Sequence, residues 1–256
     1  MKDDVGREVD LPRTPRRVVS LVPSLTEAVA VTVPGILAGA TDYCTHPAGL
    51  DVPRIGGSKY PDVERILDLR PDLVLANVEE NRKEDVDQLA AAGVQVWTTY
   101  PRDLDAAFAS LTRLLAALGA DRPTWLADAE VAWTAPTPDR RVTAVIPVWR
   151  KPWIVLGGGT FAGDLLRRLG IVNVFGDDPG RYPRPSLETI RKREPELVIL
   201  PDEPYSFTAD DGPEYFAPTE SVLISGRHLT WYGPSLAEAR TLLAESLTKR
   251  SGRRPS

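Results

Sequence analysis

The sequence predicts an α/β protein with two lobes, each built on a mainly parallel sheet, joined by a short connecting helix and leaving a ligand cleft between them. Two observations lead to this prediction. Short apolar runs alternate with amphipathic stretches along the chain, which is the rhythm of β/α units. In addition, VERILDLRPDLVLA at 63–76 returns as LETIRKREPELVIL at 187–200, without a gap and at a constant offset of 124 residues.

The elements of the first lobe follow from this rhythm. Short buried strands are predicted at 18–21, 36–41, 73–76 and 94–98. Helices are predicted from about Thr26, from Asp62, from Arg82 and over 104–118. In the last of these helices apolar side chains recur with a period of 3.6 residues, and Gly119 supplies the stop.

A second series of elements follows a helical connector. About 14 helical residues are predicted over 121–134, which corresponds to roughly 21 Å. Strands are then predicted at 142–147, 154–156, 173–175, 197–201 and 222–225, and helices from Thr160, Ser186 and Ser235. The predicted domain boundaries are 1–119 for the first lobe, 120–136 for the connecting helix and 137–256 for the second lobe.

The repeated segment indicates that the two lobes arose by duplication. Glu64 aligns with Glu188, Ile66 with Ile190 and Pro71 with Pro195, and the apolar run that follows aligns as well. A helix followed by proline and a strand is common in α/β proteins, and glutamate is favoured in a first helical turn. Five aligned positions without a gap are more than this common pattern of helix, proline and strand requires. Duplicated lobes leave an interdomain cleft, a preferred place for small ligands.

Composition excludes several classes of protein. The net charge of −5 and pI of about 5.2 argue against nucleic acid as a partner, because duplex binding depends on clustered cations. No apolar run approaches the roughly 18–20 residues that span a bilayer. The opening MKDDVGREVDLP has no basic region followed by an apolar one, so no signal peptide is visible. One cysteine, Cys44, excludes an internal disulfide.

Aromatic residues at the ends of predicted strands form the candidate ligand site. Loops at the carboxyl ends of strands are where open α/β sheets bind ligands, and rigid rings bury a large area with little loss of rotamer freedom. The aromatic candidates are Tyr43, Trp149, Trp153, Tyr182, Trp231 and Tyr232. Polar candidates in the same loops include Asp42, Ser58, Asn77 and Arg150. Trp97, Trp125 and Trp133 are interpreted as packing residues.

Other motifs give weaker signals. His46 and His228 are the only histidines, which argues against a site for a naked transition metal; a solvated loop is the preferred interpretation of His46. The glycine-rich GGGTFAGD at 157–164 lacks a P-loop ending, and a tight strand-to-helix connection explains it better. No Gly-x-Ser-x-Gly motif is present, and no pair of carboxylates stands out for catalysis. We therefore expect neither enzymatic activity nor a resident cofactor.

An ordered series of motifs resembles the class III substrate-binding proteins of ABC importers, the family of cobalamin, haem and ferric-siderophore receptors. The series is RRVVSLVPSLTEAV, TDYC, GGSKYPDVERILDLRPDLVLA and DVDQLAAAGVQV, and the resemblance runs from about residue 5 to residue 247. It implies two α/β lobes joined by one long helix. Here the connector looks shortened.

The resemblance also implies functional roles. Tyr43, Trp149, Trp153 and Tyr182 align with aromatic ligand contacts of the cobalamin receptor, whereas Ser58 and Asn77 stand where that receptor has aromatic residues. Glu64 and Glu188 align with the two glutamates that dock onto arginines of the membrane permease. The implied ligand is a corrinoid, with haem or a ferric siderophore next.

The location and the class of function remain open at this point. The resemblance implies a monomeric, extracytoplasmic receptor that binds a metal chelate and meets an ABC permease. The missing export signal keeps a cytosolic location open, and with it an enzyme or cofactor-handling protein on the same fold.

Overall fold

The computed structural model describes residues 1–249, which divide into two compact units. Unit 1 comprises Met1–Pro101, Asp105–Ala127 and the short segment Tyr232–Pro234. Unit 2 comprises Arg102–Leu104, Asp128–Trp231 and the chain from Ser235. The predicted connector at 120–136 contains helix α5 (Thr124–Ala132), whose residues are shared between the units.

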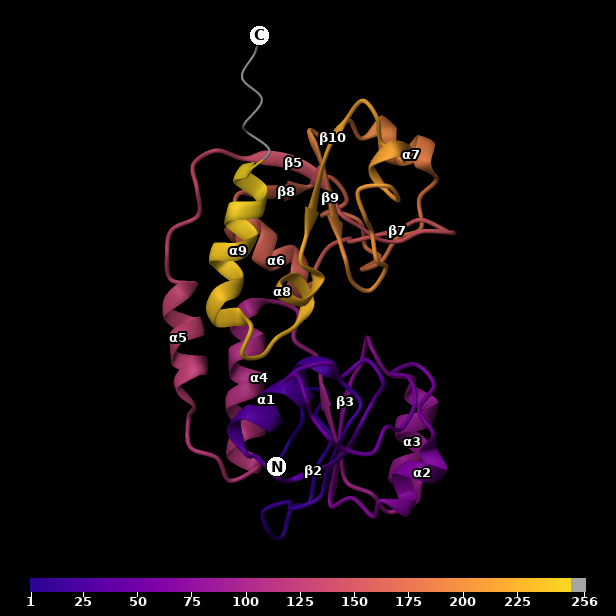
Figure 1. The fold of residues 1–256 in the computed structure, drawn as a ribbon, viewed down its shortest axis with the longest axis vertical. Coiled ribbons are helices and arrows are strands. Elements are labelled where there is room, and N and C mark those ends of the chain that lie inside the picture. The colour runs from indigo at the N-terminus through magenta and orange to yellow at the C-terminus, as the bar shows by residue number, and fades with distance from the viewer. Residues whose placement is uncertain (250–256) are drawn as a thin grey trace. The chain divides into compact units, whose positions relative to one another are not determined.

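Unit 1 is a parallel four-stranded sheet with the order β2-β1-β3-β4. Its strands are β1 (Val18–Ser20), β2 (Leu37–Ala40), β3 (Leu73–Asn77) and β4 (Val96–Thr99). Its helices are α1 (Pro23–Thr32), α2 (Val63–Asp68), α3 (Lys83–Ala91) and most of α4 (Leu104–Ala117). Figure 1 shows α1 and α4 on one side of this sheet and α2 and α3 on the other.

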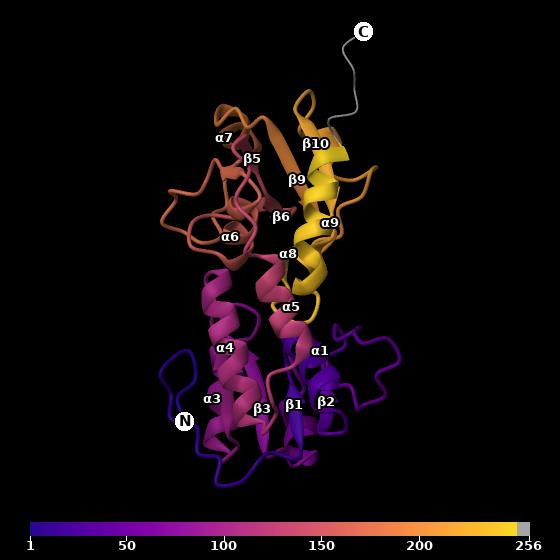
Figure 2. The ribbon, with the colours of Figure 1, turned by 90° about the vertical axis from the view of Figure 1, so that its left-hand side faces the viewer.

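Unit 2 contains a second parallel sheet, with the order β10-β9-β5-β8. Its strands are β5 (Val142–Val145), β8 (Ile171–Asn173), β9 (Leu197–Pro201) and β10 (Glu220–Ile224). An antiparallel pair, β6 (Pro147–Trp149) and β7 (Ile154–Val155), is inserted after β5. The remaining helices are α6 (Phe161–Arg168), α7 (Leu187–Lys192), the 3-10 helix η1 (Pro213–Tyr215), α8 (Gly226–Thr230) and α9 (Leu236–Lys249). Helix α9, yellow in Figure 2, runs beside β10.

The two sheets have the same topology. In unit 1 the first strand pairs with the second and third, and the fourth lies outside the third; β5, β8, β9 and β10 repeat this arrangement in unit 2. The prediction of α/β architecture with mainly parallel sheets is confirmed. Among the described helices, none has the length and apolar character needed to cross a bilayer.

The sequence repeat corresponds to one structural unit that occurs twice. Helices α2 and α7 each have six residues, and a side chain caps each of them: Asp62 accepts from the backbone N–H of Arg65, and Ser186 from that of Thr189. Two residues after each helix the chain turns through a left-handed residue, Arg70 with φ 46° in unit 1 and its counterpart Glu194 with φ 47° in unit 2.

The acidic residue that follows each proline of the repeat also has the same role in both units. Asp72 accepts backbone N–H groups of Arg16 and Arg17 just before β1, at 2.8 and 3.0 Å. Glu196 accepts the N–H of Thr143 in β5 at 2.8 Å. The hydrogen bond from Arg16 is the main cause that lowers the pKa of Asp72. Each carboxylate thus connects the start of the repeat's strand to the neighbouring strand, which is β1 in unit 1 and β5 in unit 2.

Strand β6, the 3-10 helix η1 and helix α8 were not predicted, and three other elements differ from the predicted bounds. Helix α5 has nine residues instead of about 14, since Thr134 donates its hydroxyl to the carbonyl of Val131 at the helix end. Helix α1 begins at Pro23, a residue that suits the first turn because it has no N–H to satisfy. Strand β8 ends at Asn173, whose side chain accepts from Phe175 N and donates to Leu156 O.

The two side-chain caps should contribute equally to stability. We expect Asp62→Ala and Ser186→Ala each to lower the free energy of unfolding by about 1 kcal/mol, because each leaves a helical N–H without its partner. Urea denaturation followed by circular dichroism measures this. Glu188→Ala, in the same first turn but without a capping bond, serves as the control and should change stability by less than about 0.5 kcal/mol. Equal effects of the cap and control variants would contradict the assignment.

Candidate functional site

In unit 1 the candidate residues lie in the long loop between β2 and α2 and at the end of β3, and hydrogen bonds hold these segments together. Within the long loop, the N–H of Asp42 donates to Gly56 O at 2.9 Å. Arg54 donates to the carbonyls of Thr41 and Cys44 at 3.0 and 2.9 Å and thereby fixes the path of this loop. The loop after β3 is joined through Asn81, whose amide donates to Ser58 O at 2.9 Å.

Tyr43 is the exposed aromatic residue of these loops among the sequence candidates. Its side chain is 65% exposed. The ring lies over Gly57, where an added Cβ would be 3.5 Å from the ring edge. Asp42 beside it is also exposed, and Ser58 is half-buried. Sequence analysis missed Tyr60, an exposed ring in the same loop as Ser58, with the Arg82 guanidinium 5.2 Å from its centre.

Asn77 and Tyr232 form a buried polar network within unit 1. The Asn77 amide donates to the Tyr232 hydroxyl at 2.8 Å and to Thr99 Oγ1 at 3.3 Å. Thr99 Oγ1 donates to Ala76 O, so it accepts from the Tyr232 hydroxyl, which lies 2.8 Å away. The side-chain oxygen of Asn77, Oδ1, accepts the backbone N–H groups of Glu79 and Glu80. Both side chains are therefore engaged in holding the loop after β3.

Tyr232 brings a distant segment into this unit. It is only 4% exposed, and burial raises its pKa well above the ordinary value for tyrosine. The next residue, Gly233, approaches helix α1 so closely that a Cβ would lie 2.9 Å from Ser24 O. Tyr232 was predicted as a ligand contact; in the structure its ring and hydroxyl anchor Tyr232–Pro234 in unit 1.

Cys44 has no free thiolate to offer a metal. Its sulfur lies 3.0 Å from Thr26 Oγ1 and 3.2 Å from Thr41 Oγ1, and burial raises its pKa. Across residues 1–249 there is no group of three or more histidine, cysteine, aspartate or glutamate side chains placed to hold a metal ion.

In unit 2 two of the candidate tryptophans, Trp149 and Trp153, are carried by the inserted β6–β7 hairpin. Trp149 is 42% exposed, and its ring meets Tyr205 edge to face with centroids 5.6 Å apart. Trp153 is half-buried and stacks on Phe207 at 6.3 Å, with Tyr215 and Phe216 against its edges. Trp149 is thus presented to solvent, whereas Trp153 is built into the aromatic core of the unit.

Arg150 locks this hairpin to the loop after β9. Its guanidinium is paired with Asp211 at 3.0 Å, donates to the Tyr205 hydroxyl at 3.1 Å and bonds to the Tyr215 hydroxyl. These contacts, with the Tyr205 bond as the main cause, raise the pKa of Arg150. The positive charge of Arg150 is therefore compensated within the unit.

The remaining candidates of unit 2 differ in exposure. Tyr182 is exposed in the loop before α7. Trp231 is buried, and its indole donates to Glu203 at 3.1 Å beneath the Arg227 guanidinium. In the glycine-rich segment, a Cβ on Gly157 would stand 2.0 Å from Gly180 O. The tight connection predicted for 157–164 thus has a packing reason.

Glu64 and Glu188 occupy identical positions in their own units. Each is the second residue of a six-residue helix, and each is exposed. Glu188 also pairs with Lys192 at 2.7 Å on the open surface. The two glutamates thus have the same helical position in the two copies of the repeat.

Exposed rings on loops that gather at the ends of parallel strands are typical of a ligand-binding protein. Residues 18–217 match the periplasmic binding protein family, and the chain belongs to this family. The alternative of an enzyme on the same fold is thereby excluded. Periplasmic location of the family also favours an extracytoplasmic site of action over the cytosol.

Individual relatives agree with this assignment. The vitamin B12-binding protein of Pectobacterium carotovorum is 25% identical over 91% of this chain and 89% of its own length. Among solved structures, the periplasmic vitamin B12-binding protein BtuF of Vibrio cholerae is similar with a TM-score of 0.72 and 19% identity, covering 94% of this chain and 99% of that one. The periplasmic heme-binding protein RhuT of Roseiflexus sp. RS-1 gives 0.75 and 20%, covering 91% and 98%.

The Tyr232 anchor makes a pH-dependent contribution that can be measured. We expect Tyr232→Phe to lower the free energy of unfolding by about 1–3 kcal/mol near neutral pH, because Asn77 and Thr99 lose a buried partner. The folded-state pKa of Tyr232 is raised, so the tyrosine of the unfolded chain ionises first, and wild-type stability falls as the pH rises above about 10.

Urea denaturation from about pH 8 to pH 11 tests both parts. The difference between wild type and Tyr232→Phe should shrink at the alkaline end. Tyr43→Phe, at an exposed ring, is the control and should leave stability and its pH profile nearly unchanged. A constant difference across the range would contradict the role of the buried hydroxyl.

Proposed function

We propose that this chain is the receptor of an ABC importer and that it binds a corrinoid. The observation that carries the ligand assignment is the similarity to a vitamin B12-binding protein over nine-tenths of the chain. The exposed rings of Tyr43, Trp149 and Tyr182 support it, since flat aromatic surfaces suit a broad macrocycle. Haem and ferric siderophores are the competing ligands.

The compensated charge of Arg150 favours neutral ligand groups beside Trp149, although Lys151 in the same turn is exposed. Propionates of haem and anionic siderophores prefer a free arginine or lysine. Arg150, the cation beside Trp149, already pairs with Asp211 and two tyrosine hydroxyls. A corrinoid presents amide groups, which need hydrogen bonds more than counter-charges.

The partner we propose is the permease of the importer, met through Glu64 and Glu188. Their identical helical positions in two duplicated units suit a partner that offers two equivalent cations. Both carboxylates are exposed, so docking needs no rearrangement of either helix. The receptor would act outside the cytoplasm as a monomer.

Titration distinguishes the three ligands. We expect micromolar or tighter binding of cyanocobalamin by isothermal titration calorimetry, and weaker binding of haemin and of a ferric hydroxamate. Trp149→Ala should weaken binding about tenfold, as expected for a central aromatic contact. Val172→Ala, at an exposed apolar residue of strand β8, is the control. Absence of binding to all three ligands would overturn the ligand proposal.

Docking is tested by transport in cells that carry the matching permease. The double variant Glu64→Ala with Glu188→Ala should reduce uptake to background and leave ligand affinity unchanged, because both carboxylates lie outside the ligand loops. Glu84→Ala with Asp177→Ala, also at exposed acidic positions, is the matched control. Normal uptake by the first variant would refute the docking role without affecting the ligand proposal.

A further inference from the structure

In unit 1 a tight turn at 57–60 presents the ring of Tyr60 to solvent. An isolated antiparallel bridge between Gly56 and Pro61 closes this turn. Gly56 has a φ of 82°, and a Cβ on it would stand 3.3 Å from the carbonyl oxygen of Tyr60, so the position favours glycine. Tyr60 itself is 75% exposed. A defined backbone path thus holds a large ring in water.

Two hydrogen bonds connect the turn to the segment that follows β3. The Lys59 ammonium donates to the carbonyl of Glu79, and the Asn81 amide donates to the carbonyl of Ser58 at 2.9 Å. Val78 precedes Glu79 in this segment and is 42% exposed. An exposed apolar side chain therefore lies in the segment that is bonded to the turn.

Tyr43 contacts the same turn. Its ring edge lies 3.5 Å from the position of a Cβ on Gly57, the first residue of the turn, and Tyr43 is 65% exposed. Tyr43, Tyr60 and Val78 thus gather around one turn, and we call them the Tyr60 patch. Single exposed apolar residues are ordinary on protein surfaces, whereas several around one loop mark a binding site.

The Arg82 guanidinium supports the ring of Tyr60. Its central carbon, Cζ, lies over the ring at 5.2 Å from the centroid. Arg82 precedes helix α3, and the carboxylates of Glu84 and Asp85 lie 3.6 and 3.8 Å from its Nε. Because these carboxylates offset the charge, the guanidinium fixes the ring without offering a strong site for an anion.

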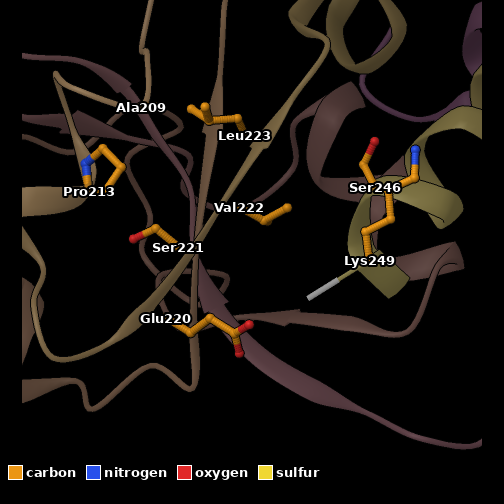
Figure 3. Close-up of a pocket in the computed structure, with 8 residues that line it drawn as sticks. All are labelled: Ala209, Pro213, Glu220, Ser221, Val222, Leu223, Ser246 and Lys249. Atoms are coloured by element: carbon orange, nitrogen blue, oxygen red, sulfur yellow. The ribbon is translucent and has the colours of Figure 1, made fainter. Parts of the chain in front are cut away.

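A groove over strand β10 in unit 2 is a surface of a different kind. With a volume of about 530 Å³ it is large enough for a small ligand, and Figure 3 shows Val222 and Leu223 of β10 beside it. Leu223 is as exposed as Val78, at 42%. The described residues that line the groove include no aromatic side chain. A flat ligand that packs on rings therefore finds them at the Tyr60 patch and not at this groove.

We propose that Tyr60 is a ligand-contact residue, whose ring packs against the flat face of a neutral macrocycle with Tyr43 and Val78 beside it. The inference rests on the proposed function, because it adds a residue to the same ligand site. Arg82 is a positioning residue, which acts on the ligand through the Tyr60 ring. The ligand class follows from the patch, since two rings and a valine offer apolar surface and the neighbouring cation is already offset.

Calorimetric titration of the full chain with cyanocobalamin tests the contact. Tyr60→Ala should weaken binding about tenfold, the effect of removing an aromatic contact. Tyr60→Phe should bind within about twofold of wild type, because the ring is kept. Val78→Ala should weaken binding about threefold. Leu223→Ala, at the groove in Figure 3 and with the same exposure as Val78, is the control and should bind as wild type does.

Combined variants test the positioning role of Arg82. Arg82→Ala should weaken binding about threefold in the wild-type chain and should have no further effect in the Tyr60→Ala background, because its contribution passes through the ring. A purely structural role would weaken binding equally in both backgrounds, and that result would overturn the positioning role. Melting curves establish that each variant is folded.

The outcomes separate this inference from the proposed function. Wild-type affinity in Tyr60→Ala would overturn the Tyr60 contact and leave the corrinoid proposal in place, since Trp149→Ala tests that proposal independently. A tenfold loss in Tyr60→Phe would assign the contact to the hydroxyl and overturn the ring contact. Absence of cyanocobalamin binding by the wild-type chain would overturn both.

Discussion

The functional loops of both units depend on the parallel pairing of their central strands. Parallel strands end at the same edge of a sheet, so backbone pairing brings together the loops after β2 and β3, and likewise those after β5 and β9. Three features of the repeat fix where strands β3 and β9 begin. These are the capped helix, the residue with positive φ and the carboxylate that accepts backbone N–H groups. One strand arrangement, used twice, therefore brings together the loops that carry candidate residues in each unit.

The two units diverge at points where this arrangement tolerates additions. In unit 2 a hairpin is inserted between β5 and α6, where unit 1 has a connection of two residues between β1 and α1. The insertion carries Trp149 and Arg150, and the contacts of Arg150 hold it rigid. Unit 1 instead has an N-terminal segment along β4. The two units therefore share one framework and differ in what is added to it. The hairpin gives unit 2 an exposed tryptophan, and the N-terminal segment covers the edge strand β4 of unit 1.

Much of this framework was accessible from local sequence signals. Helix caps at Asp62, Thr160 and Ser186 were predicted, because a short polar side chain before an amphipathic run satisfies helical N–H groups within three residues. The β6 strand was missed, since PVW is too short to show a period. Tyr43 in the loop after β2 and Trp149 at the end of β6 are exposed, whereas Trp231 and Tyr232, which follow helix α8, are buried.

The sequence by itself determined most of the strands and helices, because these follow from periodicity, capping and turn residues that act over a few positions. It also contained the repeat and the ordered motifs that carry the resemblance to the family. Only the tertiary structure decided which loop residues remain exposed. Tyr232 is buried by Asn77, 155 residues away, and the charge of Arg150 is compensated by Asp211, 61 residues away. Such contacts leave no local pattern, since a side chain's surroundings depend on which distant segment packs against it.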